Sequence, residues 1–280
     1  MASTTPQQPD SGARQERYSA GYGSGIQQYT NVRSATVQGS FILPHLRPGM
    51  SLLDCGCGPG TITVGLAEIL DPGEVIGIDI EASQIEGAQS LASEKGTSNV
   101  RFQVASMYEL PFPDSSFDAI FEHAAMMYLR EPLKALQEMR RVLKPGGVIG
   151  ICDADFTGDV QWPSNPMIIE SLAIWKKVWE HNGGTPNFGR QHRSLLREAG
   201  FIGIEASAYV DPFGTPEATQ RWGDILANMT LEGPFAETAL ELGLADRAKT
   251  EKIAAAFEEW GKHPDAFFAR TWCTAVAWKQ

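Results

Sequence analysis

Short apolar runs and helical patterns alternate through the first half of the chain. The apolar runs are five or six residues long, and such runs are typical of strands buried on both faces. They lie at residues 50–54, 74–79, 100–104, 117–122 and 148–152. Segments with helical periodicity follow the first, second and fourth runs, at 61–70, 82–95 and 131–143. Strands that alternate with crossover helices indicate a parallel, doubly wound α/β sheet.

The second half has a different pattern, because all seven tryptophans lie beyond residue 160 among helical segments. Helices are predicted at about 165–182, 216–230 and 245–261. A shorter helix at 195–201 precedes a strand at 202–209, and a final strand is predicted at 267–278. The alternating apolar pattern of the final strand favours antiparallel pairing with the strand before it. The helices between these two strands would then form a cap.

The N-terminal residues 1–24 are rich in Gly, Ser, Gln and Pro, which predicts a flexible segment. Residues 26–46 fit the period of one helix. Tyr18, Tyr22 and Tyr29 stand among glycines before or within this stretch. That arrangement suits a mobile flap that closes over a bound ligand.

Composition and charge narrow the class of protein. The 280 residues are 42% hydrophobic and 20% charged, which is enough for a packed core. The net charge of −11 would repel the phosphates of a nucleic acid, so nucleic acid is not an expected partner. No apolar run approaches the roughly 18–20 residues of a membrane span, and the N-terminus lacks the apolar core of a signal peptide. We expect a cytoplasmic protein without a membrane span, and a homodimer remains open.

The four cysteines do not form a metal-binding pattern. They are Cys55, Cys57, Cys152 and Cys273, and paired CxxC or HxxxH spacings are absent from the sequence. Free cysteines are often buried as small apolar residues. We therefore expect structural thiols and no bound metal.

A glycine-rich turn follows the first predicted strand, with Asp54 directly before Gly56, Gly58 and Gly60. At the carboxyl end of a strand such a turn lets the backbone approach a ligand closely. The spacing is not the G-x-G-x-x-G of dinucleotide-binding folds. A carboxylate before the turn also suits a cationic ligand better than a pyrophosphate.

Four segments together resemble the class I S-adenosylmethionine-dependent methyltransferases, in the branch that includes the quinone-biosynthesis C-methyltransferases (methyltransferase type 11). They are LLDCGCGPGTIT (52–63), VIGIDIEASQI (75–85), ELPFPDSSFDAIFEHAAMMYL (109–129) and ALQEMRRVLKPGGVI (135–149). The resemblance covers about residues 40–205 and implies a Rossmann-like sheet of seven strands with the last strand antiparallel. We expect the methyltransferase domain to span 25–280, with a helical cap inserted near the C-terminus. Segments 156–188 and 211–264 would be the cap, and they would select the substrate.

The resemblance also implies roles for residues that match the family motifs. The residues that would bind the cofactor are Asp54, Gly56, Gly58, Gly60, Asp79, Ile80, Ser106, Met107 and Glu122. Asp54 and the glycines would line the methionine end, whereas Asp79 would accept hydrogen bonds from the ribose. Ile80 would pack on the adenine, and a backbone carbonyl at Glu122 or His123 would receive the ammonium. Ser106 replaces the aspartate common in the family, so it supplies a hydroxyl without a charge.

The methyl acceptor is expected to be a small metabolite that is apolar or aromatic, such as a natural product or a quinone-like compound. The N-P-P-[YF] pattern of adenine- and glutamine-methylating relatives is absent, as is a basic face. The expected acceptor contacts are Tyr29, Tyr128, Trp162 and Trp222. The candidate bases are His123 and Asp155, with Asp153, His181 and His192 as further candidates.

Two other functions remain open at this point. A protein of this fold can bind the cofactor and act as a cyclase or a regulatory protein without transferring methyl. An NAD-dependent dehydrogenase would share the glycine turn and an acidic residue on the ribose. The sequence leaves open whether the acceptor atom is O, N, C or S.

Overall fold

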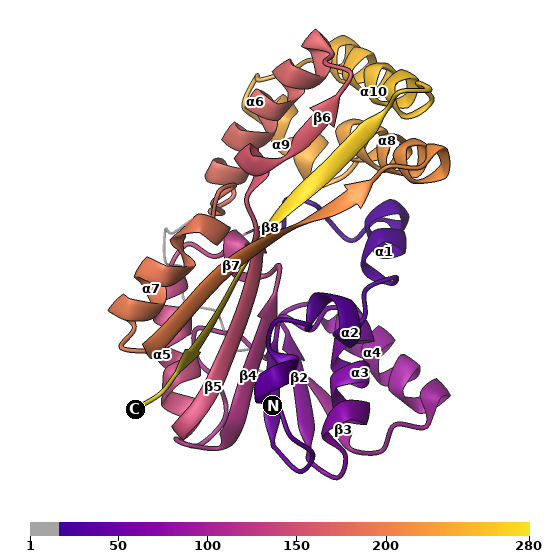
Figure 1. The fold of residues 1–280 in the computed structure, drawn as a ribbon. Coiled ribbons are helices and arrows are strands. Elements are labelled where there is room, and N and C mark those ends of the chain that lie inside the picture. Colours follow the sequence, from indigo (N-terminus) through magenta and orange to yellow (C-terminus); the bar gives the residue numbers. More distant parts are fainter. Residues whose placement is uncertain (1–16) are drawn as a thin grey trace, which may run out of the picture.

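In the computed structural model, which describes residues 17–280, one mixed sheet runs through the molecule and helices cover both of its faces (Figure 1). Five parallel strands form the first part of the sheet: β1 (Leu52–Cys55), β2 (Val75–Asp79), β3 (Val100–Val104), β4 (Phe117–His123) and β5 (Leu143–Ala154). The strand order is β3-β2-β1-β4-β5-β8-β6, with β7 paired to β8. Because the order reverses between β1 and β4, the carboxyl ends of these two strands form a topological switch point.

The helices that cover this parallel part bury the alternating side chains of the strands. They are α3 (Thr61–Leu70), α4 (Ala82–Lys95), α5 (Pro132–Val142) and α7 (His192–Glu198). Leu52 packs with the residues of α3 and α4, whereas the neighbouring Leu53 packs with those of α5 and α7. Successive strand residues point to opposite faces, so a strand covered on both sides must be apolar throughout. This explains why the sequence shows continuous apolar runs.

Two long antiparallel strands leave the sheet and extend into a second, helical layer. They are β7 (Ile202–Phe213) and β8 (Phe267–Trp278). From Trp278 to Trp272, β8 pairs with β5, and from Ala269 to Phe267 it pairs with the short strand β6 (Val160–Trp162). The expected antiparallel end of the sheet is therefore confirmed.

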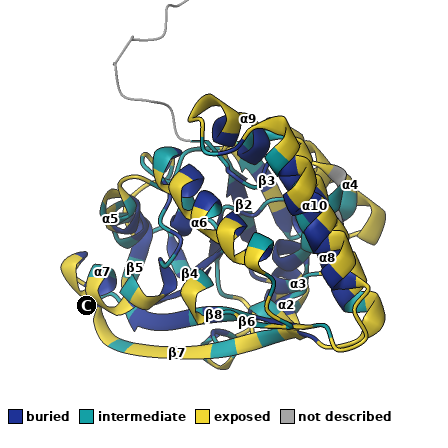
Figure 2. Ribbon diagram, turned by 90° about the horizontal axis from the view of Figure 1, so that it is seen from above, coloured by how far each residue is buried: buried dark blue, intermediate teal, exposed yellow. Residues whose placement is uncertain are grey.

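The cap consists of four helices: α6 (Pro166–His181), α8 (Pro216–Leu231), α9 (Pro234–Glu241) and α10 (Arg247–Gly261). Its buried side chains form a core cluster of their own, which includes Val178, Trp222, Phe235, Phe257 and Trp260. Figure 2 shows that α8 and α10 expose one side and bury the other. The helices predicted for this region are confirmed to within two residues at each end.

Two details of the sequence prediction are wrong. The described sheet has eight strands instead of seven, because β6 adds a strand inside the segment assigned to the cap. The single helix predicted for residues 26–46 is broken into α1 (Ser24–Thr30), α2 (Ala35–Gln38) and the 3-10 turn η1 (Leu43–His45). Pro44 has no N–H to donate to a helical carbonyl, and Gly39 caps the end of α2. Apolar periodicity alone does not reveal these breaks.

The remaining elements are short 3-10 turns: η2 (Met126–Tyr128), η3 (Phe156–Gly158) and η4 (Gly189–Gln191). The flexible N-terminal segment was predicted for residues 1–24, and residues 1–16 lie outside the described part. Within the described part, Ser19 is buried and accepts a hydrogen bond of 3.0 Å from the Asn182 side chain. Residues near the start of the described chain thus pack against the cap.

Gly60, which packs against α4, and Gly87, which lies within α4, provide a matched pair of glycines for a test of packing. A Cβ added to Gly60, which has φ +79°, would lie 2.7 Å from the Ala88 Cβ, whereas one added to Gly87 would meet nothing within 4 Å. We expect Gly60→Ala to destabilise the protein by about 1–3 kcal/mol. Gly87→Ala should stabilise it by roughly 0.5–1 kcal/mol, because alanine suits a helix interior better. Urea unfolding measures both changes, and equal effects of the two variants would contradict this packing.

Candidate functional site

The glycine turn after β1 forms the floor of a pocket at the switch point. The amides of Gly56 and Cys57 both donate to the Ile78 carbonyl, at 2.8 and 2.9 Å, so the turn folds back over the end of β2. Gly58 has φ +51°, and a Cβ there would have only the Gln84 Oε1 atom within 4 Å. Gly58 therefore faces open space that a ligand can fill.

Gly60 does not line this pocket, contrary to its expected role in cofactor binding. Its Cα faces Ala88 of α4 and Phe102 of β3. The third glycine instead permits close packing of α3 against its neighbours.

Two carboxylates line the pocket. Asp54 is buried and accepts a hydrogen bond of 2.6 Å from the Thr63 hydroxyl, and burial raises its pKa to about 7. Asp79 accepts hydrogen bonds from the Gly58 amide at 3.0 Å and from the Glu81 amide at 2.9 Å. Burial also raises the pKa of Asp79. A cationic group or hydroxyl donors would stabilise the ionised form of both.

The side wall of the pocket carries apolar surface beside Asp79. Ile80 is 72% exposed, which is unusual for isoleucine, and it lines the pocket together with Ser106 and Met107. The Ser106 hydroxyl accepts a hydrogen bond from the Tyr108 amide at 3.2 Å. We call the cavity bounded by Asp54, Gly56, Gly58, Asp79 and Ile80 the glycine-loop pocket.

Glu122 does not reach the glycine-loop pocket. Its carboxylate accepts hydrogen bonds from the Ala125 and Met126 amides, at 2.7 and 2.9 Å. The adjacent Asp153 accepts one from the Met127 amide at 3.0 Å and lies 3.0 Å from the His192 ring. These two carboxyl groups hold the turn that follows β4. Of the two residues whose backbone carbonyl was expected to receive the ammonium, His123 lines the pocket and Glu122 does not.

His123 is buried and lines the glycine-loop pocket, as a candidate base should. Its ring packs against Trp272 with a centroid distance of 4.9 Å. Neither ring nitrogen has a hydrogen-bond partner among the described residues. Burial, with a smaller contribution from Arg33, holds its pKa well below the usual value. The ring is thus neutral and weakly basic.

Asp155 is not available as a base in this structure. Its carboxylate accepts hydrogen bonds from Arg190 Nη2 at 2.7 Å and from the Thr157 hydroxyl at 3.0 Å. These partners hold its pKa below the usual value against the effect of burial. It lines neither the glycine-loop pocket nor the cavity described next. The further candidates His181 and His192 also lie outside both.

A second cavity of about 430 Å³ lies between the cap and the sheet. Its walls are largely aromatic, with contributions from the cap, β8 and the N-terminal segment. The aromatic residues are Tyr18, Tyr29, Tyr128, Phe156, Trp175, Trp179, Trp222, Phe257, Trp260, Phe268 and Trp272. We call this space the aromatic cavity; its volume lies in the range of small-molecule sites.

Three of the four expected acceptor contacts, Tyr29, Tyr128 and Trp222, line the aromatic cavity. Trp162 does not, because its side chain is 60% exposed on β6. Only its backbone carbonyl points inward, where it accepts a hydrogen bond of 3.0 Å from the Trp260 indole. The sequence indicates that Trp162 belongs to the cap segment. It does not indicate which face of the three-residue strand β6 carries the side chain.

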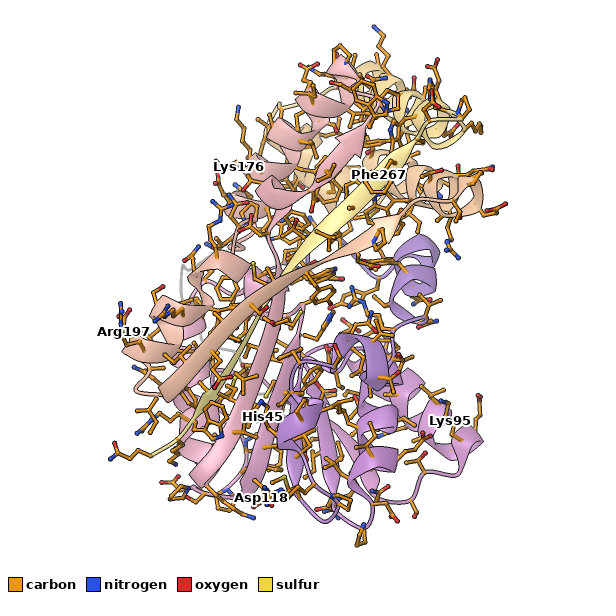
Figure 3. All side chains as sticks on the ribbon, in the orientation of Figure 1. His45, Lys95, Asp118, Lys176, Arg197 and Phe267 are labelled. Carbon is orange, nitrogen blue, oxygen red and sulfur yellow. The ribbon has the colours of Figure 1, made fainter. Side chains whose placement is uncertain are left out.

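The two cavities meet, and six residues line both of them: Tyr18, Ile26, Thr30, Arg33, Ala124 and Tyr128. Tyr18 and Tyr128 contact each other edge to face, with ring centroids 4.5 Å apart. Figure 3 shows side chains filling the region between the sheet and the cap, where Phe267 marks the start of β8, while Asp118 lies at the opposite end of the sheet. Arg33 and Trp272 were not among the sequence candidates.

Comparisons with known proteins identify the family and the fold of this chain. A family model described as a methyltransferase domain matches residues 46–225. The probable methyltransferase ltbC of Aspergillus luteorubrus is 31% identical, over 94% of this chain and 97% of that protein. A demethylmenaquinone methyltransferase of Staphylococcus aureus is 40% identical over 59% of this chain and 73% of that protein. The YcgJ protein of Bacillus subtilis has a similar fold, with a TM-score of 0.56 at 19% identity, over 86% of this chain and 97% of that one.

Residues 17–280 contain no group of three or more His, Cys, Asp or Glu side chains able to hold a metal ion. In the same part of the chain, every helix is too short or too polar to cross a membrane.

The raised pKa of Asp54 predicts that the affinity for the cofactor implied by the sequence motifs depends on pH. An ammonium group binds the ionised carboxylate, and the ionised fraction decreases as the pH falls below the raised pKa of about 7. We expect the affinity for S-adenosylhomocysteine to be highest above about pH 7.5 and to fall up to about ten-fold per unit below pH 7. Titration calorimetry between about pH 5.5 and 7.5 measures this dependence.

The matched variants are Asp54→Asn, which removes the titrating group, and Asp114→Asn, whose side chain is 76% exposed. Asp54→Asn should bind more weakly with little pH dependence, and Asp114→Asn should behave as the parent protein. An affinity of the parent protein that does not change with pH would contradict the role of Asp54.

Proposed function

The chain belongs to the class I S-adenosylmethionine-dependent methyltransferases, and we propose that it methylates a small aromatic or apolar metabolite bound in the aromatic cavity. The observation that carries this proposal is the junction of two cavities of different chemistry. One has carboxylates and a glycine turn, the other has aromatic walls, and they share six lining residues.

The residues of the glycine-loop pocket fit S-adenosylmethionine, which is the cofactor of this family. Asp54 would bind the ammonium of the methionine end, and the open space at Gly58 would take its chain. Asp79 would accept hydrogen bonds from the ribose hydroxyls, while Ile80 and Met107 would pack on the adenine. When bound, the cofactor supplies a methyl group activated by a positively charged sulfur.

The aromatic cavity would align the acceptor and keep water away from it. Residues at helical spacing on α6, namely Ile168, Leu172, Trp175 and Trp179, present one face to the cavity. From the opposite side, Phe268 and Trp272 of β8 complete the wall. Rigid aromatic side chains provide large contact surfaces at a small entropy cost. Alignment of the acceptor against the cofactor lowers the entropic part of the barrier to a displacement reaction.

The proposed acceptor class is a natural product or a quinone-like compound. Similarity to a demethylmenaquinone methyltransferase supports a ring compound as acceptor. The enclosed aromatic walls support the same class. The alternative function, cofactor binding without methyl transfer, is not favoured, since the relatives compared above are named as methyltransferases.

Transfer of label provides the direct test of methylation. We expect the purified protein, given methyl-labelled S-adenosylmethionine and a panel of aromatic natural products and quinols, to release S-adenosylhomocysteine and a labelled product. Mass spectrometry identifies the product, and a variant with Gly58→Val is the control, because its side chain would fill the pocket. Tight cofactor binding without turnover on any member of a broad panel would favour the non-methylating alternative.

Trp222 and Trp162 allow a matched test of the acceptor site. Trp222 lines the aromatic cavity, whereas Trp162 is exposed outside it. We expect Trp222→Ala to raise the acceptor KM or lower kcat by about ten-fold or more, with the affinity for S-adenosylhomocysteine nearly unchanged. Trp162→Ala should keep the activity of the parent protein. Steady-state kinetics with the acceptor found above provide the measurement.

Trp222 also packs in the cap core, so its truncation can cost about 3–5 kcal/mol of stability. Trp222→Phe keeps the ring and serves as the milder variant. Melting temperature and cofactor affinity are measured alongside turnover. If activity falls only in proportion to the loss of folded protein, Trp222 is a core residue without a direct role at the acceptor.

A further inference from the structure

Arg33 is a charged side chain at the junction of the two cavities without an opposite charge to pair with. It lines both the glycine-loop pocket and the aromatic cavity. Within residues 17–280 it forms neither an ion pair nor a side-chain hydrogen bond. Its guanidinium lies over the rings of Tyr29 and Trp272, 5.0 and 5.6 Å from their centroids. The rings hold the group in place and leave its N–H donors available.

The other arginine of the aromatic cavity has a different environment. Arg270 lies 2.9 Å from the Asp159 carboxylate, and both side chains are less than 15% exposed. Its guanidinium also lies 4.4 Å from the Phe156 ring centroid. Arg270 is therefore paired with a carboxylate, although its Nε–H lacks a well-aligned hydrogen bond, whereas Arg33 has no ion pair within residues 17–280.

One carboxyl group that interacts electrostatically with Arg33 is Asp211 on β7. It lines neither cavity, and burial raises its pKa although Arg33 and Arg270 oppose this effect. Asp211 therefore weakens the positive potential at the junction without occupying the donors of Arg33.

Unpaired buried polar atoms accompany Arg33 around the junction. Trp222, with its indole N–H, and Asn187, with its side-chain oxygen, are residues of the aromatic cavity, and His123, with two unpaired ring nitrogens, is a residue of the glycine-loop pocket. None of these four atoms has a hydrogen-bond partner among the described residues. A buried polar atom without a partner costs free energy, so such atoms are usually matched by a ligand or by water.

We propose that Arg33 binds an anionic oxygen of the methyl acceptor, carried as a carboxylate or a phenolate on an aromatic body. This inference rests on the proposed function and narrows its acceptor class. A guanidinium over aromatic faces is suited to a planar oxyanion, since it donates two N–H groups in a fixed geometry. Neutral hydrocarbons would leave the charge of Arg33 unpaired in a partly buried site, so they are poor acceptors.

Binding of a phenol as its phenolate would also make a protein base unnecessary. The proton would leave to solvent as the phenol binds, because Arg33 stabilises the charged form. His123 is suited to this arrangement, since burial beside Arg33 keeps its ring neutral and weakly basic. Asp155, the other predicted base, is held by Arg190 outside the junction.

Calorimetric titration of two probes of equal shape tests the proposal. The probes are 2-naphthoate, which is anionic, and 2-naphthamide, which is neutral, each titrated into protein saturated with S-adenosylhomocysteine. We expect 2-naphthoate to bind the parent protein about ten-fold or more tightly than 2-naphthamide. Arg33→Met should remove this preference by weakening 2-naphthoate alone, and Arg33→Lys should keep part of it.

The matched control is Arg247→Met, which makes the same charge change at a side chain 90% exposed on α10. It should leave the preference intact, which excludes a general effect of net charge. Melting curves and S-adenosylhomocysteine affinity establish that the Arg33 variants are folded. Where Arg33→Met does not fold, the comparison of the parent protein with Arg33→Lys still decides.

A chromophoric phenol separates the two kinds of anion. The yellow phenolate of 4-nitrophenol reports its ionisation, and we expect binding to lower its pKa in the parent protein but not in Arg33→Met. Preference for 2-naphthoate alone would assign a carboxylate, and a lowered phenol pKa alone would assign a phenolate. Either result supports the proposal.

Equal affinity of the parent protein for both naphthalene probes, with no change in phenol ionisation, would overturn the role of Arg33. If S-adenosylhomocysteine binds normally in that experiment, the proposed methyltransferase function is unaffected. Failure of S-adenosylhomocysteine to bind the parent protein would instead refute the proposed function itself.

Discussion

The backbone hydrogen bonds of β8 join the sheet to the cap, and both cavities depend on them. One end of this strand pairs with β5 and the other with β6, while β7 runs along almost its whole length. Since paired strands stay about 4.8 Å apart, the cap cannot slide over the sheet without breaking this ladder. Phe268, Arg270 and Trp272 occupy alternate positions of β8 and all line the aromatic cavity. Strand β8 therefore belongs both to the sheet that carries the glycine turn and to the wall of the aromatic cavity that would contact the acceptor.

Buried carboxyl groups hold the other element shared by the two cavities, the turn at residues 124–128. Glu122 and Asp153, from the adjacent strands β4 and β5, accept hydrogen bonds from three successive amides of this turn. Burial raises the pKa of both, and their mutual repulsion raises that of Glu122 further. Two uncompensated charges would be costly here, which favours retention of a proton within the pair. The position of Tyr128 at the junction thus depends on interior polar groups that never touch either cavity.

Local sequence rules predicted the sheet and the glycine loop because both depend on neighbours along the chain. Asp54 is the last residue but one of β1 and Asp79 ends β2, and these placements in parallel strands bring them to the same edge. Asp155 and Trp162 lie outside both cavities, because the direction of a side chain at or just beyond the end of a strand depends on distant partners such as Arg190 and β8. Arg33 was missed for a related reason: it follows α1 in a segment that the apolar pattern assigned to one long helix. Its importance appears only once Tyr29, Trp272 and the two cavities surround it.

The central claim is the division of the two cavities, with the cofactor in the glycine-loop pocket and the acceptor in the aromatic cavity. A crystal structure of the complex with S-adenosylhomocysteine tests it most directly. We predict that the ammonium lies beside Asp54, that the ribose hydroxyls donate to Asp79, and that the adenine packs on Ile80 while the aromatic cavity stays free for an acceptor. Binding of S-adenosylhomocysteine among the cap tryptophans, away from Asp54 and Asp79, would contradict this division.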